Sequence, residues 1–219
     1  MKHLDLTFTQ LLSGLGLVLM CIFSSVAQTA TVSDLLITEI MANPTAVSDT
    51  QGEWFELFNP TSNSIDLSGI LLSDDGSNGH IISTESSLLV NPGSYFVMAR
   101  SNDTTSNGGF VADYVYNSFS LNNTSDQIIF SDDSGELLRL NYSAGFVPAG
   151  SSMELMDTVM LPSNYAASPT TYGLGDLGSP GTTGSFTQPL AAVPLPGALW
   201  LMGSGLLGLI GFSRRQQSC

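Results

Sequence analysis

Short apolar runs rich in β-branched and aromatic residues recur every 8–15 residues through the middle of the chain, separated by Gly, Pro, Asn and Asp. Such runs and separators are typical of strands and turns, and no stretch keeps a helical period for more than about one turn. About nine strands in roughly 150 residues favour an all-β, two-sheet sandwich over an α/β fold. We expect strands at Leu35–Met41, Glu53–Asn59, Ser68–Ser73, Ser86–Val90, Tyr95–Arg100, Tyr114–Tyr116, Gln127–Ser131, Leu137–Tyr142 and Ser152–Met156.

The length of the chain limits the number of domains. Its 219 residues allow one domain of ordinary size with appended segments, because domains usually run to roughly 100–200 residues. Two complete enzymatic domains are excluded.

The middle of the chain is strongly acidic. Between residues 28 and 192 it has eighteen Asp and Glu against two basic residues, Arg100 and Arg139, which gives a net charge of −16. Such a surface repels phosphate backbones and anionic lipid headgroups, since nucleic-acid affinity comes largely from Lys and Arg that neutralise phosphates. We therefore expect no nucleic-acid partner.

The same part of the sequence lacks cysteine and lysine. The two cysteines are Cys21 and Cys219, and the lysine is Lys2. The middle can therefore form neither a disulfide framework nor a cysteine-based zinc site, and it has no lysine for a phosphate-binding glycine-rich loop.

The N-terminus has the pattern of a secretory signal peptide. Lys2 precedes an apolar stretch over Leu11–Phe23, and Ser25-Val26-Ala27 offers the small residues that a signal peptidase reads. We expect residues 1–27 to be removed after Ala27, so that Gln28 becomes the mature N-terminus. Two alternatives are disfavoured: a retained transmembrane helix, because the run is short and interrupted, and a lipid anchor at Cys21, because no small residues precede it.

The C-terminus combines three segments. It begins with Val193-Pro194-Leu195-Pro196, continues with uncharged residues over 195–212, and ends with Arg214 and Arg215. At 1.5 Å per residue a helix over residues 195–212 would be about 27 Å long, which just spans a thin bilayer. By the positive-inside rule the arginine pair would stay in the cytoplasm and leave the acidic part outside.

Residues 193–215 resemble the PEP-CTERM sorting signal of Gram-negative bacteria. The resemblance implies that an exosortase, a membrane-embedded transpeptidase, recognises the proline motif and removes the tail. It also implies an association with exopolysaccharide or other surface material. The sequence departs from the usual pattern at Leu195, where the family has a glutamate. A permanent C-terminal anchor is the alternative, and residues 185–192 are expected to be a linker.

Three ordered blocks resemble the opening of a bacterial lamin tail domain. They are LITEIMANP at 36–44, GEWFELFNP at 52–60 and IDLSGILLS at 65–73, and Val90–Val97, Ser152–Leu155 and Ser179–Gly181 resemble later segments of the family. The resemblance covers residues 31–184 and implies an immunoglobulin-like β-sandwich. In bacteria this family occurs in secreted and surface proteins, often beside nuclease, phosphatase or adhesion modules, and this sequence contains none of those modules.

The strand expected at Glu53–Asn59 has an acidic residue on each face. Alternation places Glu56 beside Trp54 and Phe58, and Glu53 on the opposite face. Because both faces are mainly apolar, we expect a central strand covered on both sides. A buried carboxylate needs hydrogen bonds or a cation. We expect Glu56 to be bonded to backbone amides of a neighbouring loop, with metal ligation by Glu53 or Glu56 as the alternative.

No catalytic or cofactor-binding residue is expected. His80 is the one histidine left after signal cleavage, and it follows an acidic glycine-containing segment without a nucleophile elbow. We therefore interpret His80 as a solvated turn residue rather than as the base of a Ser-His-Asp triad. Paired carboxylates for glycoside hydrolysis are numerous, but no pattern groups them into a pocket.

Two oxygen-rich turns are candidate calcium sites. The candidate ligands are Asp74, Asp75, Asp132, Asp133 and Glu136. Calcium prefers carboxylate and carbonyl oxygens, but neither turn has the spacing of an EF-hand, and ordinary turn chemistry explains both.

These features together predict an exported, non-enzymatic protein at the cell surface or in the extracellular matrix, with a structural or adhesive role. Its expected partners are signal peptidase, an exosortase-like enzyme, and exopolysaccharide or surface proteins. The alternatives are a calcium-dependent carbohydrate-binding module and a secreted hydrolase.

Overall fold

The computed structural model describes residues 29–83 and 86–184. The expected signal peptide (1–27), linker (185–192), and sorting signal (193–215) with its span at 195–212 lie outside these residues. Among the described residues, every helix is too short or too polar to cross a bilayer.

The described chain is almost entirely β-structure. Its strands are β1 (Leu36–Met41), β2 (Trp54–Phe58), β3 (Ile65–Asp66), β4 (Leu71–Ser73), β5 (Gly79–Ile81), β6 (Leu89–Val90), β7 (Tyr95–Ala99), β8 (Tyr114–Val115), β9 (Asp126–Asp132), β10 (Gly135–Tyr142), β11 (Met153–Leu155) and β12 (Tyr165–Ala167). Three short helices accompany them: the 3-10 helix η1 (Val32–Asp34), α1 (Asp49–Gly52) and the 3-10 helix η2 (Pro162–Asn164).

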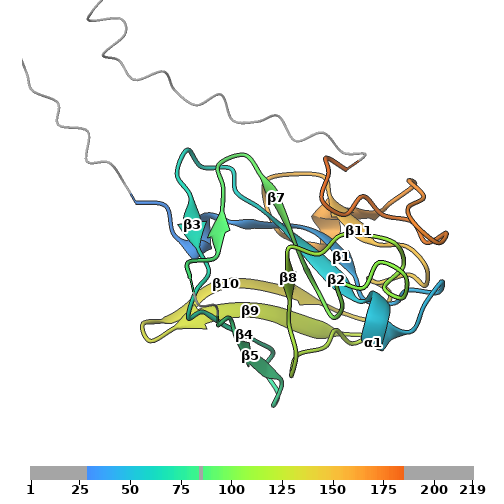
Figure 1. Ribbon diagram of the computed structural model, residues 1–219, viewed down its shortest axis with the longest axis horizontal. Coiled ribbons are helices and arrows are strands. Elements are labelled where there is room, and N and C mark those ends of the chain that lie inside the picture. The colour runs from blue at the N-terminus through green and yellow to red at the C-terminus, as the bar shows by residue number, and fades with distance from the viewer. Residues whose placement is uncertain (1–28, 84–85, 185–219) are drawn as a thin grey trace, which may run out of the picture.

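Two sheets form the layers of a sandwich (Figure 1). The first has the order β12-β11-β1-β2-β7-β8 and the second the order β10-β9-β4-β5, with β3 and β6 as a separate pair. The main core lies between them: Ile37, Phe55 and Leu57 of the first sheet share it with Leu72 and Phe130 of the second. The expectation of an all-β two-sheet sandwich is confirmed.

The outer face of the first sheet is also covered. Trp54 is fully buried there in a second apolar cluster with Phe110. Its ring centroid lies 5.7 Å from that of Phe110, in the β7–β8 connection, and 5.9 Å from that of Tyr172, in the segment after β12. All five residues of β2 are buried, so the expectation of a central strand covered on both sides is confirmed.

A β-bulge in β1 decides which side chains face outward. Ile37 pairs with Leu57, but the next pair is Glu39 with Glu56, so Thr38 is an extra residue. A shift of one residue turns a side chain to the other face of a sheet. The bulge thus places Thr38 and Glu39 together beside Glu56 on the outer face, rather than leaving Glu39 in the core.

All nine expected strands occur, some of them shorter than expected. The structure adds β3, β5 and β12, which have two or three residues each. Alternation with a period of two cannot be recognised over so few residues, so these strands depend on pairing with longer neighbours.

Candidate functional site

Three buried glutamates form a row across three neighbouring strands. Glu39 lies on β1, opposite Glu56 of β2 on one side and Glu154 of β11 on the other. Their exposed fractions are 1%, 1% and 2%. Glutamate is almost never fully buried unless it is paired. We call this set the glutamate row.

The segment Gly178–Gly184, here called the C-terminal strap, crosses the glutamate row. The amide of Ser179 donates to Glu39 Oε1 at 2.8 Å, and the Ser179 hydroxyl donates to Glu39 Oε2 at 2.7 Å. The amide of Gly181 donates to Glu56 Oε2, also at 2.8 Å. The expected bond between Glu56 and a loop amide is therefore confirmed, and the loop is this strap.

The sheet supplies further hydrogen bonds to the same carboxyls. The Thr38 hydroxyl donates to Glu56 Oε1 at 2.6 Å, and the Ser152 hydroxyl donates to Glu39 Oε1. The Ser179 hydroxyl also lies 3.3 Å from Glu154 Oε1, so it stands between the carboxyls of Glu39 and Glu154. Buried polar groups without such partners would be strongly destabilising.

Burial raises the pKa values of two members of the glutamate row, Glu56 and Glu39, into the neutral range. Loss of solvent raises the pKa of Glu56 to about 8, the hydrogen bond from Thr38 opposes this rise, and the nearby Glu39 carboxyl adds to it. Burial likewise raises the pKa of Glu39 to about 7 against the hydrogen bonds from Ser152 and Ser179. A protonated Glu56 carboxyl can donate a hydrogen bond to Thr38 Oγ1. The Thr38 hydroxyl can then donate to the backbone carbonyl oxygen of Glu56, which lies 3.4 Å away.

The space beside the glutamate row is too small for a substrate. The adjoining cavity has a volume of about 10 Å³, and a single water molecule needs about 10–15 Å³ on this measure. General acid or nucleophilic catalysis requires that the carboxyl reach a substrate. The chemistry available to the row is therefore to bind the strap.

The sequence of the strap fits this position. A β-carbon on Gly178 would lie 3.1 Å from both Glu39 Oε1 and the Trp54 ring, so only glycine passes there without displacement. Gly181 has a φ of 78°, a conformation that favours glycine. Close passage and a turn thus bring both strap amides onto the carboxyls.

Glu53 is engaged on the opposite face of the sheet. Its Oε2 accepts from the Leu121 amide at 3.1 Å and from Arg100 Nη1 at 3.3 Å. Burial raises its pKa to about 7, while these two partners lower it. The bonds of Glu53 and Glu56 are to protein groups, so the structure offers no support for the alternative that either is a metal ligand.

The structure corrects the interpretation of His80 as a solvated turn residue. His80 lies on β5 and is 9% exposed. Its Nε2 lies 2.9 Å from the Tyr114 hydroxyl, and its Nδ1 accepts from the Asn117 amide at 3.3 Å. These contacts connect an edge of the second sheet to β8 of the first. Within the described chain neither ring nitrogen meets a carboxylate or a serine, as a Ser-His-Asp triad would require.

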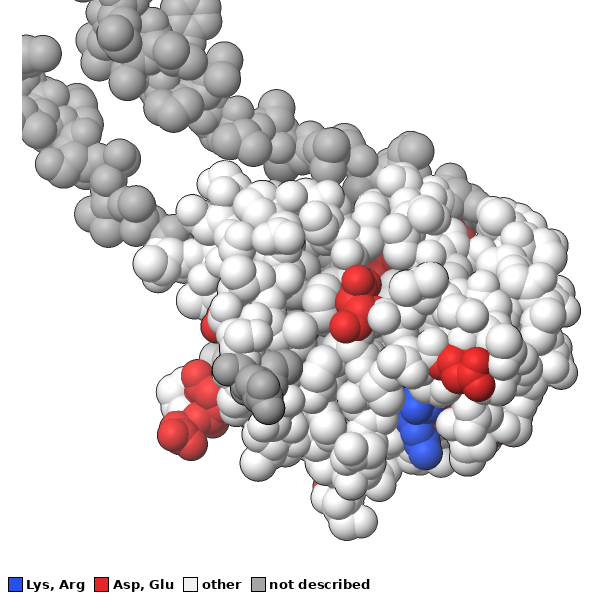
Figure 2. Space-filling model, in the orientation of Figure 1, with Lys and Arg blue, Asp and Glu red and all other residues white. Residues whose placement is uncertain are grey.

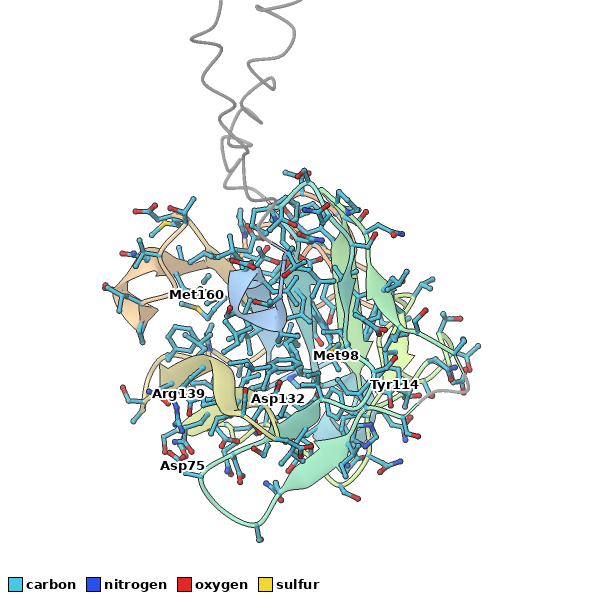
Figure 3. All side chains as sticks on the ribbon, turned by 90° about the vertical axis from the view of Figure 1, so that its left-hand side faces the viewer. Asp75, Met98, Tyr114, Asp132, Arg139 and Met160 are labelled. Carbon is cyan, nitrogen blue, oxygen red and sulfur yellow. The ribbon has the colours of Figure 1, made fainter. Side chains whose placement is uncertain are left out.

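The two acidic turns are held by groups of the protein itself. Arg139 binds both oxygens of Asp75, at 2.9 and 3.0 Å, and Glu136 Oε2 at 2.9 Å. Figure 3 shows Arg139 and Asp75 side by side. Asp74 accepts from the Gly76 amide and Asp132 from the Ser134 amide, as in ordinary turns. Asp133 is exposed. Among the described residues no three acidic, histidine or cysteine side chains are placed to hold a metal ion.

Sequence reasoning identified Glu56 but missed its partners in the row. Glu154 stands between apolar residues, as Glu56 does, and Glu39 follows Thr38 in a strand whose other residues are apolar. That shared pattern was the available signal, because an acid inside an apolar strand must find a buried partner.

Comparison with known proteins gives two matches. The family model for the lamin tail domain matches residues 28–145, which is more than half of the chain. A model of the PEP-CTERM protein-sorting motif matches residues 192–215. No curated protein matches the chain. Glu39 and Glu56 lie inside the first match, whereas Glu154 and the strap follow it.

Proposed function

Because the chain belongs to the lamin tail domain family, we propose that it is an exported, non-enzymatic surface protein with a structural or adhesive role, sorted by an exosortase-like enzyme. The PEP-CTERM motif at residues 192–215 carries this proposal. The proposal includes removal of residues 1–27 by signal peptidase, and contact with exopolysaccharide or surface proteins after sorting.

The use of the buried acids supports a non-enzymatic role. Glu39 and Glu56 accept hydrogen bonds from the amides of the strap, and the adjoining cavity has room for about one water molecule. His80 bonds to a phenol and an amide. These contacts stabilise the fold.

The strap supports a role in which the domain is attached through its C-terminal side. Ser179 and Gly181 are fixed to buried carboxyls, and the residues that match the sorting motif begin eight positions after Gly184. A force on the tail would therefore reach a segment that is bonded to the centre of the first sheet.

Two sets of variants test the sorting proposal. Pro194→Ala with Pro196→Ala should leave membrane insertion intact but stop removal of the tail, because Ala is compatible with a membrane helix. Arg214→Glu with Arg215→Glu should impair orientation or retention, because cytoplasmic positive charge orients a short span.

Mass spectrometry of the mature protein from cell surface and medium gives the result. We expect an N-terminus at Gln28 and the absence of residues after the proline motif. Full-length protein that keeps Cys219 at the envelope, unaffected by the proline substitutions, would refute sorting and leave a permanent anchor. A lipidated N-terminus at Cys21 would refute cleavage after Ala27.

A further inference from the structure

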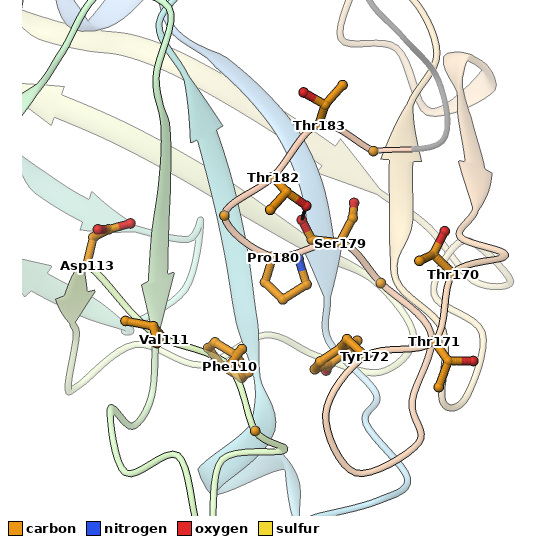
Figure 4. A pocket seen from close by; sticks show the side chains of 14 residues that line it. Phe110, Val111, Asp113, Thr170, Thr171, Tyr172, Ser179, Pro180, Thr182 and Thr183 are labelled. Carbon is orange, nitrogen blue, oxygen red and sulfur yellow. Dashed lines mark hydrogen bonds between the residues drawn. The ribbon is translucent and has the colours of Figure 1, made fainter.

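A groove lies on the outer side of the C-terminal strap. Its volume is about 680 Å³, within the range of roughly 300–1,000 Å³ that is usual for ligand sites. The β7–β8 connection forms one wall and the chain after β12 forms the other (Figure 4). We call it the outer groove; its lining residues include Phe110, Val111, Asp113, Tyr172, Pro180 and Thr183.

The base of the outer groove is rigid. Trp54 Nε1 donates to the Tyr172 hydroxyl at 3.1 Å, and the rings of Phe110 and Tyr172 pack edge to face with centroids 6.1 Å apart. The two walls cross where the backbones of Gly109 and Gly173 touch: a β-carbon on Gly109 would lie 2.9 Å from Gly173 Cα. The site is thus formed before any ligand arrives, which reduces the entropy cost of binding.

The lining combines apolar rings with hydroxyl groups. Figure 4 shows Phe110, Tyr172 and Pro180 toward the centre and threonines around them. Within the described residues the hydroxyls of Thr171 and Thr183 make no hydrogen bond to protein. Asp113 is fixed through one carboxylate oxygen, which accepts from the Val97 amide at 2.7 Å. A sugar ring has an apolar face and a hydroxyl periphery, which match rings at the centre and polar groups at the rim.

The charge around the outer groove excludes anionic ligands. Asp113 is the ionisable carboxylate in its lining. Both arginines of the described chain are already paired, Arg100 with Glu53 and Arg139 with Asp75 and Glu136. The face in Figure 2 is mainly uncharged, with separate acidic side chains and a basic side chain. A polyanion would meet repulsion here without a cation to offset it.

The walls also argue against an extended peptide as ligand. Peptides that bind by strand addition need an open strand edge. The lining residues from Gly109 to Asp113 end just before β8, and those after Thr170 follow β12, so they lie outside the strands.

We propose that the outer groove binds a neutral polysaccharide segment, with a sugar ring against Tyr172 and Pro180 and sugar hydroxyls bonded to Thr171, Thr183 and Asp113. The inference rests on the proposed function only in that display outside the cell would give the groove access to polysaccharide. Binding by the purified chain does not depend on sorting. A chain that is sorted but binds no polysaccharide would refute this proposal alone, and a chain that binds polysaccharide but is not sorted would refute the proposed function alone.

Affinity electrophoresis of the full chain in a non-glycosidic detergent tests the proposal. Gels containing dextran, glucomannan or hydroxyethylcellulose serve as neutral probes, and a gel containing alginate serves as the anionic probe. We expect retardation by at least one neutral polysaccharide, with EDTA present or absent, and none by alginate.

Two exposed valines provide a matched pair of variants. Val111, 75% exposed, lies in the lining, and Val159, 51% exposed, lies outside it. Val111→Glu should weaken binding by about tenfold or more, because a larger, strongly hydrated carboxylate would replace an apolar side chain of the lining. Val159→Glu should bind like the original chain. Equal melting midpoints would show that both variants are folded.

Three results would overturn the proposal. The first is the absence of retardation by all three neutral probes while the chain is folded. The second is binding that Val111→Glu and Val159→Glu affect equally. The third is binding of a different ligand in place of a neutral sugar. This would be seen as retardation by alginate alone, or as saturable binding of an extended peptide that Val111→Glu abolishes while no sugar binds.

Discussion

Raising the pH should destabilise this protein through the buried carboxyls of Glu56 and Glu39. We predict that the free energy of unfolding falls between pH 5 and pH 8. A carboxyl with a pKa near 4.5 in the unfolded chain and about 8 in the folded protein holds its proton more tightly when folded. Its stabilising contribution is therefore complete below pH 4.5 and is lost as the pH rises through 8.

The size of the effect follows from the shift at Glu56. One pKa unit corresponds to about 1.4 kcal/mol, so Glu56 alone should cost the folded state about 2 kcal/mol between pH 5 and pH 7. Glu39 and Glu53, both with a pKa of about 7, act in the same direction. The exposed carboxyls whose pKa values are lowered stay ionised in both states throughout this range, so they add no slope; they are Asp66, Asp75, Asp103 and Asp132.

Urea unfolding of the full chain, followed by far-ultraviolet circular dichroism from pH 5 to pH 8, measures this slope. Glu56→Gln should flatten it and make the protein more stable at pH 8 by at least about 2 kcal/mol. Its amide oxygen can still accept from Gly181, and its amide nitrogen can donate to Thr38. Asp103→Asn, at an exposed position whose carboxyl has a lowered pKa, is the control and should leave the slope unchanged. A stability that rises with pH, or a slope that Glu56→Gln does not alter, would refute the reasoning.

Three further predictions concern stability. The Tyr116 hydroxyl is buried without a hydrogen-bond partner in the described structure, so Tyr116→Phe should raise the free energy of unfolding by about 1 kcal/mol; a loss in urea titration would show that the hydroxyl has a partner. Asp176 accepts hydrogen bonds from the amides of Thr45 and Ala46 and from the Thr45 hydroxyl. Asp176→Ala should therefore lower the free energy of unfolding by about 2–4 kcal/mol in the same titration, and Asp176→Asn should lower it less, because its amide oxygen still accepts. Equal losses in the two variants would show that these hydrogen bonds are not the cause. Millimolar calcium or EDTA should move the melting midpoint by less than about 1 °C, since a ligand specific to the native state at 100 times its Kd would add about 2.7 kcal/mol; a large rise with calcium would restore the acidic turns as sites.

The longer strands could be predicted from local pattern, and the short ones could not. In β2, the alternation of residues 53–58 placed Glu56 on the face of Trp54, and both side chains lie there. The three-residue strand β5 was missed, and with it the burial of His80. Its position depends on contacts with Tyr114 and Asn117, more than thirty residues later.

The composition of the glutamate row depends on register, which a single sequence does not reveal. Glu154 meets Glu39 through strand pairing across 115 positions, and Glu39 faces outward because of the bulge at Thr38.

The burial of acidic side chains changes how the net charge of the sequence should be read. Six acids of the described chain are buried, so the surface is less acidic than the sequence count of −16 implies; they are Glu39, Glu53, Glu56, Asp126, Glu154 and Asp176.

The two faces of the C-terminal strap couple the glutamate row to the outer groove. The inner side of the strap bonds to Glu39 and Glu56, and its outer side contributes Pro180 and Thr183 to the groove. The titratable groups around Glu56 are Glu39, Glu154 and Tyr95, and the strap itself is uncharged. The Gly181 amide favours the ionised form of Glu56, but burial favours the protonated form and has the larger effect. A proton on Glu56 and a ligand in the groove therefore both stabilise the bound position of the strap, and thermodynamic linkage makes each strengthen the other. Binding of a neutral polysaccharide should then be tighter at pH 5 than at pH 8, and Glu56→Gln should reduce that difference. If the chain binds the polysaccharide with equal affinity at pH 5 and pH 8, the strap keeps its position whether or not Glu56 is ionised, and the coupling is refuted.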